Sequence, residues 1–381
     1  MAKKSKVGLK VPTQNELLRK YGGMIKVAAK TQESGLWLPS KFLALNYTFG
    51  GGIPFGKILE VAGEESSGKS LIAYDFAYCT QQLGGHVIWV DAEQSWMNSW
   101  AEENGIDPER VTLVNDTRIE YVADIVADLA IYLRSQYTHN EPILLVVDSI
   151  AAMDCADNID AKMVEGKAEM GGRAKALYKY FRIRSELFYK LGITQIYINQ
   201  LRTALNVGFG KDNTTTTGGA ALKFYASIRA AFYAGKTLTI KQKGKERKAG
   251  KLVTVRLIKN KVAPPRPTIS KCPVYFNPKF HEVGFDRCYG LEDVLVENDI
   301  IEKSSGGIYK YKGKTLARGE EKFQKLLEEE DELRRKLLKK AGINTIGATR
   351  KKLETLETNF FPVDGVEYEN FDEAEDDEDD E

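Results

Sequence analysis

The segment from Gly63 to Ser70 constrains the fold of this chain more than any other, because it matches the phosphate-loop pattern GxxxxGK[ST]. The mostly apolar residues 57–62 before it predict a strand, and residues 71–82 after it predict a helix. Gly63 and Gly68 permit backbone angles that side chains disfavour, so the loop can turn its N–H groups toward phosphate oxygens at the start of the helix. A chance glycine-rich turn is the weaker interpretation, because the strand and the helix stand where such a loop needs them.

Side chains of the same segment supply the charges that a nucleoside triphosphate requires. Lys69 would offer a compact cation to the outer phosphates, and the hydroxyl of Ser70 can ligate Mg²⁺. The loop as a whole is expected to surround the phosphates, and its members are Gly63, Glu64, Glu65, Ser66, Ser67, Gly68, Lys69 and Ser70.

Length and composition suit one large α/β domain with smaller attachments, since the chain has 381 residues and is 43% hydrophobic. No apolar run approaches 18 residues, so we expect no transmembrane helix. The basic residues 1–6 lack the apolar region of a secretory signal. The cysteines form no CxxC pair, which favours free thiols in a reducing compartment over disulfides or zinc; they are Cys79, Cys155, Cys272 and Cys288.

The charge of the chain is unevenly distributed, because residues 372–381 contain nine acids. Removing nine negative charges from a net charge of +1 leaves a body of +10. A basic body with an acidic tail predicts a polyanionic partner and an internal competitor for it. A tail that only solubilises the protein accounts for the same residues equally well.

Strand and helix patterns alternate along the first half of the chain. This alternation predicts a mainly parallel sheet with helices on both faces. Beyond residue 223, strands joined by short turns predict antiparallel pairs at the sheet edge, with a basic hairpin tip at 241–251. The expected strands are 86–91, 111–114, 143–148 and 195–199, and the expected helices are 96–104, 120–137 and 172–191.

The pattern also predicts smaller units around this core. Residues 14–30 have helical spacing, broken at Gly22-Gly23. Beyond residue 287 we expect a helix at 291–298, a turn rich in tyrosine and glycine at 304–314, and a highly charged helical stretch at 319–341 that presents only charged surface. The expected divisions are a basic N-terminal arm and helix (1–33), a core (34–286), a small C-terminal domain (287–345) and a tail (346–381) that is acidic from 367.

Two acids complete the candidate nucleotide site. Asp148 ends an apolar strand, and parallel strands present such residues at the carboxyl edge of the sheet, where ligands bind. There it can hold Mg²⁺ through water. Glu93 follows another strand and could polarise a water for attack on the γ-phosphate. Taken alone, Glu93 could equally be a solvated loop acid.

Residues 201–219 are rich in glycine, threonine and asparagine and predict a long mobile loop. Arg202 and Lys211 can contact phosphates, and Leu205 and Phe209 can contact bases. An ordinary surface loop is the weaker interpretation, since structureless segments of this length inside compact domains are usually functional or disordered.

Several motifs occur in one order and give the chain a resemblance to a known family. They are Gly-Glu-Glu-Ser-Ser-Gly-Lys-Ser (63–70), Val-Asp-Ala-Glu (90–93), Val-Val-Asp-Ser-Ile-Ala-Ala (146–152), Ile-Asn-Gln-Leu-Arg (198–202), Thr-Thr-Thr-Gly-Gly-Ala-Ala-Leu-Lys-Phe-Tyr-Ala-Ser (215–227) and Lys-Asn-Lys-Val-Ala (259–263). From about residue 15 to about 320 the chain resembles the RecA-type homologous-recombination ATPases of bacteria and phages. The resemblance implies an α/β fold. A RecA-like P-loop ATPase core would carry a mainly parallel sheet, a helical N-terminal oligomerisation segment and a small C-terminal α/β domain.

The resemblance also implies roles for single residues. The catalytic residues would be Glu93, Gln200 and Lys69. Glu93 would activate the attacking water, and Gln200 would sense the γ-phosphate and relay to the second DNA-binding loop. The nucleotide site would include Trp100 against adenine, Asp148 and Ser70 at the metal, and Lys259 and Lys261 from a neighbouring subunit. Subunit contacts would involve Lys223, Phe224 and Arg229. The DNA-binding set is Met170, Gly171, Gly172, Arg173, Arg182, Arg202, Leu205, Phe209, Lys211, Thr215, Thr216, Thr217, Gly218 and Gly219.

The family implies a DNA-dependent ATPase that uses ATP and Mg²⁺ and forms helical filaments on single-stranded DNA for homologous pairing and strand exchange. Its partners would be single- and double-stranded DNA, further copies of itself, and single-strand-binding and mediator proteins. It would act in the cytoplasm of a bacterial or phage-infected cell, near the nucleoid. A hexameric helicase on the same core is one alternative, and a single-strand coating protein with structural ATP is another.

Overall fold

The computed structural model describes residue 20 and residues 35–137, 140–160, 171–203, 214–242 and 244–356. The chain divides into two compact units, Met1–Gly35 and Leu36–Glu381, and all that follows concerns the second. The segment expected to form an N-terminal helix and the acidic tail lie outside the described residues, apart from Lys20.

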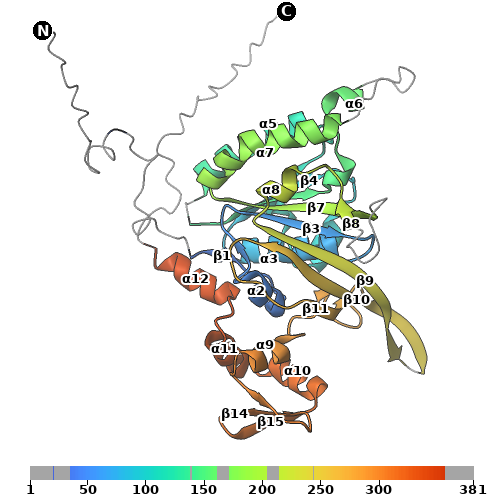
Figure 1. Cartoon of the computed structure of the whole chain (residues 1–381), viewed down its shortest axis with the longest axis vertical. Coiled ribbons are helices and arrows are strands. Elements are labelled where there is room, and N and C mark those ends of the chain that lie inside the picture. Colours follow the sequence, from blue (N-terminus) through green and yellow to red (C-terminus); the bar gives the residue numbers. More distant parts are fainter. Residues whose placement is uncertain are drawn as a thin grey trace, which may run out of the picture. The chain divides into compact units, whose positions relative to one another are not determined.

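A ten-stranded sheet forms the centre of this unit (Figure 1). Its path runs β12-β11-β10-β9-β3-β7-β6-β4-β5, with β8 attached to β7. The strands from β9 to β5 are parallel, and β10 to β12 continue the sheet antiparallel. The parallel members are β3 (Ile58–Gly63), β4 (His86–Asp91), β5 (Val111–Val114), β6 (Ile143–Asp148), β7 (Ile193–Thr203) and β9 (Ile228–Gln242). The mainly parallel sheet and its antiparallel edge are confirmed.

Helices cover both faces of the sheet, as the alternating pattern predicts (Figure 1). Side chains of β6 alternate between two cores: Leu144 and Val146 face α2 (Leu43–Phe49) and α3 (Lys69–Gln82), whereas Leu145 and Val147 face the other side. That second face is covered by α5 (Ile119–Gln136), α7 (Gly172–Lys190) and α8 (Ala221–Tyr225). Burial on both faces explains why these strands are apolar throughout.

The antiparallel edge is built on a long hairpin. Strands β9 and β10 (Lys245–Asn260) pair over most of their length and turn at Gly244, whose φ of 75° suits glycine. Strands β11 (Ile269–Tyr275) and β12 (Gly284–Phe285) complete this edge. The predicted basic hairpin tip therefore stands at the end of two paired strands.

A third core joins the C-terminal elements. Three short antiparallel strands, β13 (Glu302–Lys303), β14 (Ile308–Tyr311) and β15 (Lys314–Arg318), pack with α9 (Leu291–Glu297), α10 (Glu320–Glu329) and α11 (Asp331–Lys340). Leu43 and Tyr47 of α2 belong to the same cluster, so this core includes a helix that also packs on the large sheet.

Two local expectations in this region were wrong. The segment expected as a turn at 304–314 contains strand β14, because Tyr309 and Tyr311 alternate with half-buried neighbours and their rings fill the core. The stretch at 319–341 is helical as expected, in two helices that meet at Glu330, but it presents more than charged surface, since Phe323 and Leu327 of the first helix and Leu337 of the second are buried in that core.

The remaining elements are short. Helix α12 follows Thr345, whose hydroxyl accepts from the Ala348 N–H and caps it. Among the described residues, no helix combines the length and the apolar character needed to cross a membrane. These elements are β1 (Trp37–Leu38), β2 (Ile53–Pro54), α4 (Asn98–Glu103), α6 (Ala156–Asp160), α12 (Ile346–Glu354), β8 (Thr214–Thr216) and the 3-10 helices η3 (Pro108–Arg110) and η4 (Ile150–Ala152).

Candidate nucleotide and nucleic-acid sites

The phosphate loop connects the central strand β3 to helix α3. Gly63 lies in register with Gln200 on one side and Phe232 on the other. A Cβ at Gly63 would approach the Ser67 Oγ to 2.5 Å and the Phe232 carbonyl oxygen to 2.7 Å, so only glycine fits. Gly68 has a φ of +86° directly before the first helical residue. The loop backbone is therefore curled at the carboxyl edge of the sheet, the shape that a phosphate cradle needs.

Lys69 and Ser67 hold the curled loop together. The Lys69 Nζ donates to the Glu64 carbonyl oxygen at 2.6 Å, and the Ser67 Oγ donates to the same oxygen at 2.8 Å. Burial lowers the pKa of the Lys69 ammonium, although the carboxylates of Asp148 and Glu93 oppose that shift. Glu64, Glu65 and Ser66 are exposed.

A hydroxyl and a buried carboxylate meet beside the loop. The Ser70 Oγ donates to the Asp148 Oδ2 at 2.7 Å, and Asp148 is only 4% exposed. Burial raises the pKa of Asp148 to about 6, and the charges of Glu93 and Asp91 add to the effect. Hard oxygen ligands with surplus negative charge suit Mg²⁺, so this donor set fits the ion.

Glu93 lies close to Asp148 because strands β4 and β6 are adjacent, with Asp91 opposite Asp148 in register. The Ser149 Oγ donates to the Glu93 Oε1, and Glu93 itself is exposed. An exposed, oriented carboxylate next to a metal site can accept a proton from water.

Gln200 links the phosphate loop to the next candidate region. It stands opposite Gly63 on β7, and its Oε1 accepts from the Arg202 Nη2 at 3.1 Å. Two residues on, β7 pairs with β8, so that Leu201 faces Thr216 and Arg202 faces Thr215. The segment expected as a loop at 201–219 thus has paired strands at its ends, because β-branched threonines suit extended cross-strand pairs.

The two segments expected to bind DNA meet on helix α7. A Cβ at Gly218 would lie 2.8 Å from the Leu177 side chain, and one at Gly219 would lie 3.2 Å from the Ala174 Cβ. Gly171 and Gly172 lead into the same helix from the other segment, with Gly171 at a φ of +92°. The end of one segment therefore packs against the start of the helix that follows the other.

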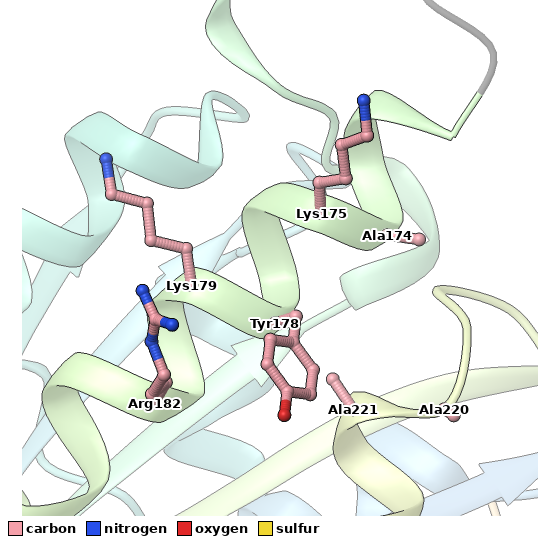
Figure 2. Close-up of a pocket in the computed structure, with 7 residues that line it drawn as sticks. All are labelled: Ala174, Lys175, Tyr178, Lys179, Arg182, Ala220 and Ala221. Carbon is pink, nitrogen blue, oxygen red and sulfur yellow. The ribbon is translucent and has the colours of Figure 1, made fainter.

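A pocket of about 470 Å³ opens at this junction (Figure 2). Figure 2 shows Tyr178 pointing from α7 toward Ala221, with three cationic side chains leaving the same helix. Tyr178 is 50% exposed, and an exposed ring beside cations can stack on a base while they contact phosphates. The pocket is lined by Ala174, Lys175, Tyr178, Lys179, Arg182, Ala220 and Ala221.

Sequence reasoning found Arg182 here and missed Lys175, Tyr178 and Lys179. Lys175, Lys179 and Arg182 are spaced i, i+4 and i+7 on a predicted helix, which places them on one face. That spacing was the available signal. Arg173 points elsewhere, since its Nη1 donates to the Ala151 carbonyl oxygen at 3.0 Å.

The residues assigned to a subunit interface lie together where α8 meets β9 and β10. The Lys259 Nζ donates to the carbonyl oxygens of Lys223 at 2.6 Å and Phe224 at 3.2 Å. Phe224 is 69% exposed, and Lys261, the residue that follows β10, is exposed as well. Arg229 stands opposite Lys259 in the strand register.

The other candidates divide into two groups. Trp100 lies on α4, half-buried against the core on the α3 side of the sheet. Thr217 is half-buried and Thr216 buried. The residues that lie outside the described part are Met170, Leu205, Phe209 and Lys211, and Thr215 is described by its backbone alone.

Comparisons with known proteins agree with these motifs. A family model described as the RecA N-terminal domain matches residues 14–277. The chain is 33% identical over 339 residues to Protein RecA of Corynebacterium efficiens, which covers 88% of this chain and 81% of that protein. It is also similar to Protein RecA of Streptomyces coelicolor (33% over 335 residues, 84% and 82% covered) and of a Picosynechococcus species (32% over 317 residues, 83% and 85% covered).

Proposed function

This chain belongs to the RecA family of DNA-dependent ATPases of recombination and repair, and on that premise we propose how its residues perform the reaction. ATP would bind at the phosphate loop with Mg²⁺, and the protein would assemble on single-stranded DNA to promote homologous pairing and strand exchange. The family match supports the reaction, and the close packing around Gly63 supports the phosphate loop as the site where ATP binds.

In the proposed nucleotide complex, loop N–H groups from Gly63 to Ser70 hold the phosphates. The Lys69 Nζ exchanges its hydrogen bond to the Glu64 carbonyl oxygen for the phosphates, because its compact positive charge interacts more strongly with anionic oxygens. Ser70 and Asp148 would hold Mg²⁺, which would supply positive charge to the phosphates. Glu93, oriented by Ser149, takes the proton of the attacking water.

Gln200 is the proposed sensor of the γ-phosphate. It stands beside the first loop glycine and is hydrogen-bonded to Arg202, which lies where β7 pairs with β8. A change at the phosphate can thus reach the antiparallel pair β7–β8, which we call the β7–β8 hairpin and propose as a DNA-binding element, through the side chains of Gln200 and Arg202. This register of Gln200 with Gly63 is the observation that carries the proposal, because it joins the nucleotide to the DNA loop directly.

DNA is proposed to lie over α7 and the hairpin. Arg202, Lys175, Lys179 and Arg182 would contact phosphates, and Tyr178 would stack on a base. The remaining predicted members are Met170, Gly171, Gly172, Arg173, Leu205, Phe209, Lys211, Thr215, Thr216, Thr217, Gly218 and Gly219.

Self-association would complete the nucleotide site. Head-to-tail contacts between identical subunits that do not close produce helical filaments. Lys259 and Lys261 would reach the ATP of a neighbour, while Lys223, Phe224 and Arg229 would support the contact. The exposed Phe224 ring suits a buried position in such a contact.

Domain roles and surroundings follow the same proposal. Residues 1–33 would oligomerise, 34–286 would form the ATPase core, 287–345 would form a small accessory domain, and the tail would begin at 346. Trp100 would contact adenine. Single-strand-binding and mediator proteins would be partners in a bacterial or phage-infected cytoplasm near the nucleoid.

The test is phosphate release from ATP, titrated with single-stranded DNA. We expect turnover to rise with DNA, and we expect Lys69→Ala to abolish both ATP binding and turnover. Electron microscopy of the same samples should show open helical filaments. Closed rings would favour the helicase, and turnover indifferent to DNA would contradict the proposal.

A further inference from the structure

Glu60 is a carboxylate in the middle of the central strand, where every neighbour along the strand is buried. It is 0% exposed and lies in register with Tyr197 of β7 and Arg229 of β9. A buried charge is costly unless it is paired and hydrogen-bonded. Glu60 meets that condition through two partners on opposite sides, the Arg229 Nε and the Asn199 Nδ2.

Asn199 connects Glu60 to the hairpin that is proposed to bind DNA. Its Nδ2 donates to the Glu60 Oε1 at 3.0 Å and to the Thr217 carbonyl oxygen at 3.1 Å. Its Oδ1 accepts from the Gln200 N–H at 2.9 Å and from the Thr217 Oγ1 at 2.5 Å. Both amide donors and both lone pairs are therefore used. Thr217 and Gln200 cannot move apart without breaking a bond to the Asn199 amide, and the same amide also donates to Glu60.

Arg229 connects Glu60 to the candidate interface lysines. Its guanidinium donates to the Glu60 Oε2, and its backbone pairs with Lys259 of β10. Lys259 in turn holds the backbone of α8. Burial lowers the pKa of Lys259, the charges of Lys261 and Arg229 add to that shift, and Glu60 opposes it. Glu60 thus pairs with Arg229 and also stabilises the charge of Lys259.

We infer that Glu60 is a positioning residue that couples the DNA-binding hairpin to the lysine pair facing a neighbour's nucleotide. The inference rests on the proposed function. When DNA moves Thr217, the Asn199 amide, whose donors and acceptors are all in use, must rotate. The hydrogen bond from Asn199 to Glu60 then changes, and with it the ion pair between Glu60 and Arg229. ATP at the interface acts on the same carboxylate from the other side. Such a shared group gives two ligands a mutual effect on affinity.

The experiment measures the ratio of dissociation constants for fluorescent oligo-dT without nucleotide and with a non-hydrolysable ATP analogue. This ratio reports coupling and cancels direct losses of DNA affinity. We expect Glu60→Gln to reduce it about tenfold from the wild-type value, within the usual range of such couplings. Thr217→Val, which removes only the hydroxyl donor to Asn199, should reduce it as well.

Asp75→Asn is the matched control. Asp75 is a buried carboxylate on α3 that accepts from the Ser40 Oγ and the Lys41 N–H, and among the described residues it makes no hydrogen bond to the β7–β8 hairpin, Lys259 or Lys261. It should lose a similar amount of thermal stability and keep the wild-type ratio. A lowered ratio in Asp75→Asn would assign the effect to stability and overturn the inference.

The remaining outcomes separate the inference from its premise. If wild-type protein shows a large ratio that Glu60→Gln and Thr217→Val both keep, the coupling role of Glu60 is wrong and the proposed function stands. If Glu60→Gln does not fold, Thr217→Val decides alone. A wild-type ratio of one, together with DNA-independent ATPase activity, would overturn both.

Discussion

At the scale of single residues, the nucleotide site concentrates negative charge. Asp148, Glu93 and Asp91 lie at neighbouring strand ends; Lys69 supplies a positive charge beside Asp148 and Glu93, and the hydroxyls of Ser70 and Ser149 donate to these two acids. Burial raises the pKa of Asp148, the charges of Glu93 and Asp91 add to that shift, and this negative charge suits a divalent cation. The three acids differ in burial, since Glu93 alone is exposed, and this difference separates the candidate base Glu93 from the candidate metal ligand Asp148.

Glu93→Gln should therefore keep ATP binding near the wild-type level and reduce DNA-stimulated turnover roughly 100-fold or more, because an amide cannot accept the proton of water. Binding is measured with a fluorescent nucleotide, and turnover by phosphate release. Glu109→Gln changes an exposed acid after α4 and should leave both unchanged. Normal turnover in Glu93→Gln would remove Glu93 from the mechanism.

At the scale of elements, the β7–β8 hairpin places a cation at the edge of the nucleotide site. Arg202→Ala should weaken binding to single-stranded DNA and lower the slope of log affinity against log salt by about 0.7, the value for one lost phosphate contact. Nucleotide binding without DNA should stay near normal. Lys325→Ala on α10 serves as the control. An unchanged slope in Arg202→Ala would place the DNA elsewhere.

Helices α9 and α10 enclose a second unusual carboxylate. Glu292 is 3% exposed, and its Oε1 accepts from the Gln324 Nε2 at 2.9 Å. Its Oε2 has no hydrogen-bond partner within the described part of the chain. Burial raises the pKa of Glu292 from 4.5 to about 7, and Asp293 and Glu320 add to the shift.

Because the folded state holds this proton more tightly than the unfolded state, stability should fall as the pH rises from about 4.5 to about 7. Glu292→Gln keeps the shape without the charge. Above pH 7, urea titration should give Glu292→Gln a free energy of unfolding that exceeds the wild-type value by on the order of 3 kcal/mol at most. Near pH 4.5 the two free energies should agree. Glu321→Gln, an exposed acid on α10, should follow wild type. Parallel pH curves for Glu292→Gln and wild type would contradict the prediction.

At the scale of the whole molecule, the proposed filament makes each active site the product of two chains. Lys261→Ala and Glu93→Gln should each be inactive alone, for different reasons. Mixed in equal amounts, they should recover part of the DNA-stimulated turnover, since some interfaces then contain both wild-type groups. Phosphate release is measured against the mixing ratio. A mixture as inactive as its components would contradict a shared site.

The amino-acid sequence alone determined the nucleotide half of this protein. The phosphate loop, Asp148 and Glu93 are local patterns, and a local pattern on alternating strands and helices fixes a place at the carboxyl edge of a parallel sheet. The same reasoning predicted both helical layers, because parallel strands that are covered on two faces must be apolar throughout.

Only the tertiary structure revealed which residues connect the candidate nucleotide site to the β7–β8 hairpin and to the candidate interface lysines. Glu60 was an isolated acid in an apolar strand, and its partners Asn199 and Arg229 lie 139 and 169 positions further along the chain. Strand order brings them together, and strand order follows from packing over the whole sheet rather than from any local pattern. Burial of the apolar residues of α10 and α11 could not be predicted from the sequence for the same reason. Their core partners come from other elements, as the stacked rings of Tyr309 and Phe323 show.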